Sequence, residues 1–199
     1  MKVITVNTNP LSYSCKVYLL LGTWNTLDDV NTVIDTGADG YIIDQIRKIN
    51  TGVGKKPVNQ VIITHDHFDH TGGIKHLKEE YGVAVYAKTR FNPLVDKVLE
   101  DNQQIRIADR YFTVLHTPGH SSDSISLYCD AERMLFSGDT NLLVRDTTGT
   151  FTPEYVETLK RLSKLKLDII YPGHGEPMKD NPGGILQYSL NNVLKSKIQ

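Results

Sequence analysis

The sequence is poor in cysteine, in long apolar runs and in excess charge, and each shortage excludes a class of protein. Its two cysteines, Cys15 and Cys129, form no CxxC pair and are too few for the disulfide framework of a small secreted domain. One disulfide or two free thiols are both compatible with this count, and a reducing cytoplasm favours the free thiols. We therefore assign neither cysteine as a metal ligand.

Long hydrophobic segments are also missing. No window approaches the roughly 18 consecutive apolar residues that a membrane-spanning helix needs. The first ten residues, MKVITVNTNP, lack the apolar stretch of a secretory signal peptide. We therefore expect a cytoplasmic protein that does not bind membranes.

The charges of the chain nearly cancel. Its 22 lysines and arginines face 23 aspartates and glutamates, which gives a formal net charge of -1 at pH 7. This balance gives no electrostatic reason to expect nucleic acid as a partner. What the chain does have is 199 residues, 39% of them hydrophobic, which is enough for one domain with a substantial core. We expect residues 1–199 to form that single domain.

The spacing of apolar residues predicts strands and helices that interleave along the chain. Short apolar runs between turn-like Asn, Gly and Asp positions are typical of strands, and a spacing of three or four is typical of helices. Hairpins outnumber βαβ units, which favours mixed sheets covered by helices over a doubly wound fold. The predicted strands are 3–6, 16–21, 32–35, 58–65, 83–86, a hairpin over 105–115, 124–128, 134–136 and 168–171, and the predicted helices are 40–49, 71–81, 94–99, 153–165 and 186–194.

Residues 63 to 73 read ITHDHFDHTGG and concentrate histidines and aspartates where a predicted strand ends. In an extended chain residues i and i+2 point to the same side, so His65 and His67 can present their imidazoles together. Asp69 and His70 follow where the chain turns towards a helix, and can face a neighbouring point. Imidazoles and carboxylates at this density predict a metal site.

Three further candidate ligands follow other predicted strands. His120 lies in TPGH, Asp139 in SGDT and His174 in PGHG, and a glycine precedes the candidate ligand in each motif. Glycine lets a loop pass close to an ion, and the strand behind the loop supports it rigidly. We therefore predict that these three residues join the first group around one site.

Two other histidines do not fit this arrangement. His116 is better explained as part of a strand or as a support for the loop that follows. His76 lies in a helical pattern rich in Lys and Glu, which is typical of a solvated face.

In this order, THDHFDH, TPGH, SGDT and PGHG resemble the motifs of the metallo-β-lactamase superfamily of metal-dependent hydrolases, in particular its glyoxalase II-like branch. The resemblance implies an α/β fold, an αββα sandwich of two mixed β-sheets flanked by helices, with the site at one edge of the sheets. The ligands that it implies are His65, His67 and His120 for one metal ion, Asp69, His70 and His174 for a second, and Asp139 as a bridge between the two.

The resemblance also gives a role to Asp35, in VIDTG, as a residue that supports the ligand loop from behind. A ligating imidazole needs such a hydrogen-bond acceptor to fix its tautomer. The alternative is an ordinary turn residue after a strand.

The donor set fits a hydrolytic metal centre. Nitrogen and oxygen ligands without thiolate suit zinc, manganese or iron, and we take two zinc ions as the first choice. Two such ions can lower the pKa of a shared water from about 15.7 to about 7, which makes a bridging hydroxide the nucleophile. Asp69 is then a catalytic residue that helps to orient this hydroxide. No serine nucleophile is needed, and the chain has no convincing G-x-S-x-G motif.

The predicted function is therefore hydrolysis of an ester, thioester or lactone of a small molecule. Three alternatives stay open. A persulfide dioxygenase shares the HxHxDH motif but uses one iron ion. A phosphodiesterase of the same fold is the second alternative, and a non-catalytic protein that uses the site structurally is the third.

Overall fold

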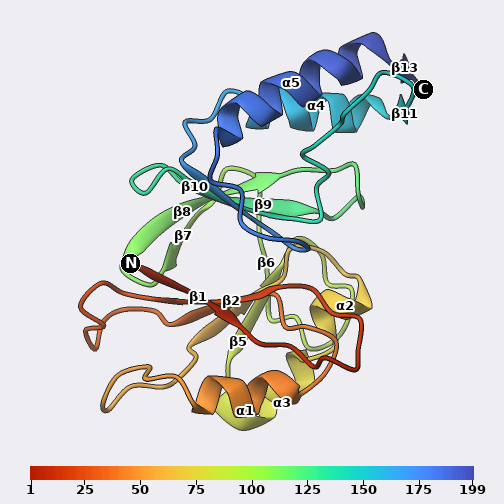
Figure 1. Cartoon of the computed structure of the whole chain (residues 1–199). Helices are drawn as coiled ribbons and strands as arrows, with labels where there is room; N and C mark the ends of the chain where they lie inside the picture. The colour runs from red at the N-terminus through yellow and green to blue at the C-terminus, as the bar shows by residue number, and fades with distance from the viewer.

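A computed structural model describes residues 1–199 as two β-sheets packed face to face, with helices on the outer face of each sheet (Figure 1). The N-terminal half of the chain, red to yellow, builds one sheet and its helices. The C-terminal half, green to blue, builds the other. This αββα arrangement of mixed sheets confirms the predicted fold class.

The first sheet follows chain order. Its strands are antiparallel at the start of the chain and parallel from the third strand onward. All five residues of the second strand, VYLLL, are buried, as expected for a strand that is covered on both faces. The elements of this half are β1 (Lys2–Val6), β2 (Val17–Leu21), β3 (Thr32–Ile34), α1 (Tyr41–Arg47), β4 (Gln60–Ile62), α2 (Phe68–Thr71), α3 (Ile74–Tyr81), β5 (Ala84–Ala87) and β6 (Lys97–Val98).

The elements of the second half are β7 (Gln104–Ile107), β8 (Arg110–His116), β9 (Ile125–Cys129), β10 (Met134–Gly138), β11 (Thr150–Phe151), α4 (Pro153–Leu162), β12 (Ile169–Pro172), α5 (Pro182–Lys195) and β13 (Lys197–Ile198). The second sheet has the order β12-β10-β9-β8-β7, and only the β10–β12 pair is parallel. The short strands β11 and β13, which the apolar spacing did not predict, pair with each other outside this sheet.

Three apolar cores hold the layers together. Ile46 of α1 and Leu77 of α3 are buried against the first sheet, and Leu159 of α4 is buried against the second. Between the two sheets lie Phe112 and Phe136, whose rings are 6.1 Å apart. Burying each such side chain contributes about 1.5–3 kcal/mol. The loops at the edges of the sheets are therefore mounted on a rigid support.

The predicted helix over residues 94–99 is wrong. In its place β6 pairs in parallel with β5, and backbone N–H groups of this segment donate to the neighbouring strand. Asp96 donates to the carbonyl of Val85 (2.9 Å) and Leu99 to that of Ala87 (2.8 Å). The apolar spacing did fit a helix, but one or two turns are too short to nucleate one, whereas the edge of β5 satisfies these backbone groups directly.

The other predicted strands and helices are present with shifted ends, and the helix predicted over 71–81 is observed as α3, with the short α2 before it. Cys15 and Cys129 are both free and buried. None of the five helices combines the length and the apolar composition that crossing a bilayer requires.

Candidate metal centre

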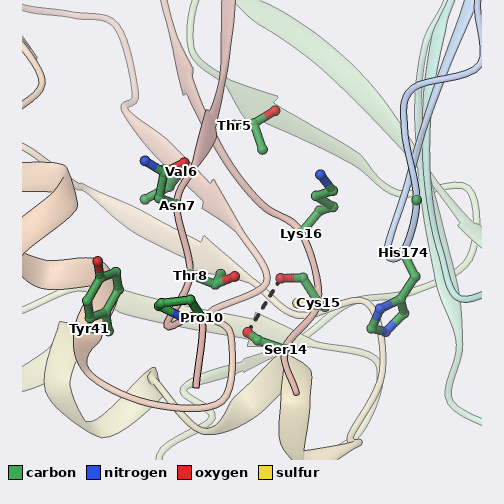
Figure 2. A pocket seen from close by; sticks show the side chains of 11 residues that line it. Thr5, Val6, Asn7, Thr8, Pro10, Ser14, Cys15, Lys16, Tyr41 and His174 are labelled. Atoms are coloured by element: carbon green, nitrogen blue, oxygen red, sulfur yellow. Dashed lines mark hydrogen bonds between the residues drawn. The ribbon is translucent and has the colours of Figure 1, made fainter. Parts of the chain in front are cut away.

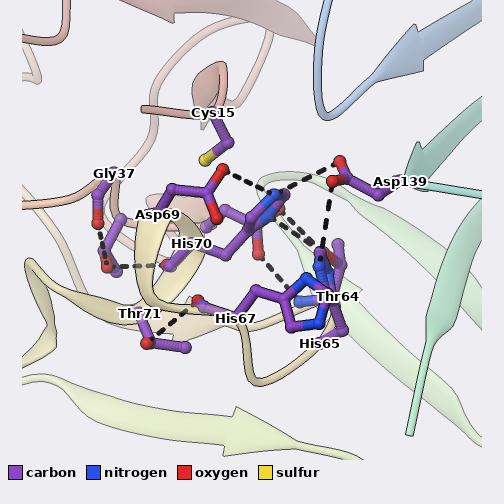
Figure 3. Close-up of polar contacts among 12 residues, drawn as sticks. Cys15, Gly37, Thr64, His65, His67, Asp69, His70, Thr71 and Asp139 are labelled. Carbon is purple, nitrogen blue, oxygen red and sulfur yellow. Dashed lines mark hydrogen bonds and ion pairs between the residues drawn. The ribbon is translucent and has the colours of Figure 1, made fainter. Parts of the chain in front are cut away.

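All seven candidate ligands meet at one edge of the sandwich, on loops that follow strands. The segment after β4 and the start of α2 supply four of them, and the loops after β8, β10 and β12 supply one each. Figure 3 shows the side chains from the first segment turned towards the carboxylate that follows β10. The residues in these loops are His65, His67, Asp69 and His70 after β4, His120 after β8, Asp139 after β10 and His174 after β12.

One group of imidazoles consists of His65, His67 and His120. The ring of His65 lies 4.5 Å from that of His67 and 4.7 Å from that of His120, measured between centroids. Nε2 of His120 is 3.0 Å from Nδ1 of His67. His65 is buried, whereas the other two rings are exposed at the rim. A single cation can therefore contact all three rings.

A second group consists of Asp69, His70 and His174. The Oδ2 atom of Asp69 lies 3.0 Å from Nε2 of His174 and 3.6 Å from Nε2 of His70. His70 is fully buried, and the other two side chains reach the surface. This group brings two nitrogens and one carboxylate to a common point.

Asp139 lies between the two groups. Its Oδ1 is 3.2 Å from Nε2 of His70, and its Oδ2 is 3.4 Å from Nε2 of His174. The same Oδ2 is 3.6 Å from Nε2 of His120 and 3.9 Å from Nε2 of His65. One carboxylate thus faces two imidazoles of each group.

Asp35 supports the ligand loop from behind. Its Oδ2 accepts hydrogen bonds from Nδ1 of His70 (2.9 Å) and from the hydroxyl of Thr64 (2.9 Å), and its Oδ1 accepts one from the Thr64 backbone N–H (2.8 Å). With Nδ1 held in this way, the His70 ring must present Nε2 to Asp139. These contacts agree with the supporting role that the family resemblance implies for Asp35. The part played by Thr64 was missed, because nothing but its place before His65 distinguishes it.

Burial and neighbouring charges perturb the pKa values of the centre. Burial, helped by the nearby His70, lowers the pKa of His65 to about 4. Burial also acts to lower the pKa of His70, but the carboxylates of Asp35 and Asp139, one beside each ring nitrogen, outweigh it and raise that pKa far above its usual value. Burial acts to raise the pKa of Asp139, but His70 and His174 outweigh it and lower that pKa. A neutral His65 and an ionised Asp139 are the forms that bind metal ions.

Three buried polar atoms at the middle of the centre make no hydrogen bond: Nε2 of His65, Nε2 of His70 and Oδ1 of Asp139. The last two are 3.2 Å apart but are not in hydrogen-bonding geometry. Buried polar atoms are normally paired, and an unpaired one costs about 1–3 kcal/mol. Imidazole nitrogens and carboxylate oxygens without thiolate are a donor set for zinc, manganese or iron. The residues therefore fit a pair of divalent cations.

Cys15 lies beneath this centre but is not part of it. Its sulfur and one ligand atom each of Asp35 and His70 lie within 4.8 Å of one another. Burial raises the pKa of the Cys15 thiol to about 11. Metal ions bind the thiolate rather than the thiol, so this raised pKa disfavours Cys15 as a ligand.

Two glycines allow the ligand loops to approach one another. Gly138 has φ +52°, and a Cβ there would lie 2.7 Å from the hydroxyl of Thr64. A Cβ on Gly173 would overlap Oδ1 of Asp139 and lie 2.9 Å from Cε1 of His70. The glycine before each ligand, noted in the sequence, thus has a steric reason at these two positions.

The two histidines set aside in the sequence lie outside both groups. His76 is exposed on α3. His116 ends β8, and its Nε2 lies 2.9 Å from the carbonyl oxygen of Ser122. It therefore supports the loop that carries His120.

The loop between β1 and β2 also reaches the centre, which sequence reasoning missed. The ring of Tyr13 stacks on that of His174, with centroids 5.1 Å apart and planes at 18°. The backbone N–H of Lys16 donates to the carbonyl of Gly173 at 2.6 Å. No sequence signal points to Tyr13, because it meets His174 only after the two sheets have packed.

Curated relatives that the chain matches include proteins named as a thioesterase and as a hydrolase. "Atrochrysone carboxyl ACP thioesterase" of Aspergillus fumigatus is 28% identical over 183 residues, which cover 85% of this chain and 43% of the relative. "Hydroxyacylglutathione hydrolase" of Rhodopseudomonas palustris is 36% identical over 124 residues, which cover 59% of this chain and 48% of the relative. The chain thus spans about half the length of the curated relatives that it matches.

Solved structures share the architecture at low sequence identity. The subclass B3 metallo-beta-lactamase BJP-1 of Bradyrhizobium japonicum superimposes with a TM-score of 0.70 and 22% identity, over 96% of this chain and 88% of that one. An archaeal metallo-beta-lactamase superfamily protein of Sulfolobus tokodaii gives a TM-score of 0.67 and 19% identity, over 99% and 88% of the two chains. The family model described as "Metallo-beta-lactamase superfamily" matches residues 14–93 and 88–174. With its αββα sandwich and its ligand motifs, the chain belongs to the metallo-β-lactamase superfamily.

Proposed function

We propose that the protein is a dinuclear metal-dependent hydrolase that cleaves thioesters of small molecules, with esters and lactones as related substrates. The observation that carries this proposal is the position of Asp139, whose carboxylate lies 3.2–3.9 Å from four imidazole nitrogens of two separate groups. A structural ion needs only one closed set of four ligands, whereas this centre offers donors for two ions. The names of two relatives, a thioesterase and a hydroxyacylglutathione hydrolase, support a thioester as the bond that is cleaved.

We divide the candidate ligands between two metal ions, for which zinc is the first choice. We propose that His65, His67 and His120 hold one, that Asp69, His70 and His174 hold the other, and that Asp139 is shared. When bound, such cations supply Lewis acidity, which makes water a better nucleophile near neutral pH and offsets negative charge that develops on the substrate.

The protein contributes orientation and proton transfer. Asp69 lies at the rim with its side chain 17% exposed, so its carboxylate can orient an attacking water and accept the proton that the water loses. The Asp139 side chain is less exposed than that of Asp69, and its lowered pKa favours the ionised carboxylate. Asp35 holds the His70 ring, so that the inner face of the centre is organised before substrate arrives.

Elemental analysis of protein purified without added metal, followed by assays of thioester hydrolysis with the identified metal, tests this proposal. We expect two divalent ions per chain and hydrolysis that a chelator abolishes. One iron ion per chain together with thiol-dependent oxygen uptake would refute the hydrolase and favour a dioxygenase. Preferential cleavage of bis(p-nitrophenyl) phosphate would favour a phosphodiesterase.

A further inference from the structure

Large apolar side chains surround the candidate metal centre on its open side. Tyr13 and Phe68 are 79% and 73% exposed, and they line one hollow together with Asp69. A second hollow, of about 290 Å³, is lined in part by His120, Asp139 and Phe151. Exposed apolar surface that gathers beside polar groups is typical of a binding site.

Positively charged side chains are scarce in the same place. Among the residues that line the four hollows touching candidate ligands, Lys16 is the one lysine or arginine. Figure 2 shows Lys16 and His174 along the same hollow. The Lys16 ammonium is paired with the carboxylate of Glu176, 2.9 Å away, and Asp39 adds a negative charge to the hollow that Tyr13 and Phe68 line.

The exposed aromatic side chains and the scarcity of basic side chains both indicate which substrates can bind. Carboxylates and phosphates are normally recognised by arginine or lysine, and a charge that leaves water without such a partner is costly. Aromatic faces, by contrast, favour apolar groups and aromatic rings. One face of Tyr13 is already held against His174, which leaves its orientation fixed for a ligand on the exposed side.

We propose that the substrates are thioesters with an apolar acyl group, packed against Tyr13 and Phe68, and with an uncharged thiol arm. This inference rests on the proposed hydrolase function. Thioesters of the same acyl group on a thiol that carries carboxylates or phosphates are then poor substrates.

The test compares phenylacetyl thioesters of N-acetylcysteamine, which is uncharged, and of glutathione, which carries two carboxylates and one ammonium group and is therefore a net anion. We expect kcat/KM of the metal-loaded protein to be roughly tenfold higher for the uncharged arm, because Lys16, the one basic side chain that lines these hollows, is already paired with Glu176. Replacing Glu176→Gln releases Lys16, and should raise kcat/KM for the glutathione thioester alone by about two- to fivefold.

Recognition of the acyl group is tested with thioesters of N-acetylcysteamine, the uncharged thiol. Tyr13→Ala should raise KM for the phenylacetyl thioester by about 3- to 10-fold and leave that for the acetyl thioester nearly unchanged, because only the former has a ring to pack. The matched control is Tyr111→Ala, which removes an exposed tyrosine near the start of β8, at the opposite end of the strand from the loop that carries His120. An equal rise for both acyl groups, or for the control, would overturn the assignment of Tyr13.

Binding of the matching thioethers, which cannot be hydrolysed, separates this inference from the proposed function. If neither thioester is cleaved, the hydrolase proposal fails, but calorimetry still measures which thioether binds. Tighter binding of the uncharged thioether supports the inference. Equal or tighter binding of the glutathione thioether, or no binding of the uncharged one, overturns it.

Discussion

Replacing Gly173→Ala should disrupt the metal centre while leaving the fold intact. Gly173 precedes His174, and its φ is not positive, so alanine can adopt the backbone conformation and only the added methyl group matters. That methyl would overlap Oδ1 of Asp139 and lie 2.9 Å from Cε1 of His70. His70 is fully buried and held by Asp35, so it cannot move aside.

The backbone at Gly173 cannot yield easily either. Its N–H donates to the carbonyl of Gly138 at 2.8 Å, and its own carbonyl accepts from Lys16 at 2.6 Å. Overpacking of this kind costs about 1–3 kcal/mol. In a chain of this size that corresponds to a fall of about 2–12 °C in Tm, measured by circular dichroism on the metal-free protein. The group that gives way is the Asp139 side chain, which then no longer faces both groups of imidazoles.

Elemental analysis after dialysis against buffered zinc measures the consequence. We expect two zinc ions per chain in the wild type and one or fewer in Gly173→Ala. The matched control is Gly183→Ala at the start of α5, where an added methyl meets no atom within 4 Å and both Tm and zinc content should hold. If Gly173→Ala binds two zinc ions with wild-type affinity, the crowded geometry around Asp139 is refuted.

Three further outcomes are expected. Asp139→Ala should lower zinc content and turnover together, because Asp139 faces both groups of imidazoles. His76→Ala removes an exposed histidine and should change neither quantity. Unchanged turnover in Asp139→Ala would contradict the position of Asp139 between the two metal ions. Asp35→Asn should weaken zinc binding about 10- to 100-fold in a competition assay with a chromogenic chelator, because the supporting carboxylate is lost; wild-type affinity would remove Asp35 from the centre. Chelation should lower Tm by about 5–11 °C for each site that is emptied, since free metal at 100 times its Kd contributes about 2.7 kcal/mol per site; an unchanged Tm would show that metal is not linked to folding.

Features of the fold and of the metal centre could be predicted from the sequence wherever a short segment contains the whole pattern. HxHxDH places four donors within six residues, and each remaining ligand follows an apolar run and a glycine, so both could be found from short segments. Asp35 was suggested by the family resemblance and then found in contact with His70. In these cases a strand end fixes the position of the side chain almost alone.

Prediction failed where distant segments decide the outcome. Residues 94–99 have helical spacing, but the open edge of β5 captures their backbone groups. Tyr13 and Thr64 carry no local signal, since their roles depend on His174 and Asp35, which lie in other parts of the chain. Local periodicity cannot report such contacts, because they exist only in the packed sandwich.

The candidate ligands are divided between the two sheets, and this has a consequence for folding. His65, His67, Asp69 and His70 belong to the half that ends with β6, whereas His120, Asp139 and His174 belong to the other half. Each proposed cation therefore links the two halves much as a covalent bridge does. Zinc uptake during refolding should lag behind the formation of secondary structure and coincide with docking of the two sheets. The rate of zinc uptake would then measure the rate at which the sheets dock.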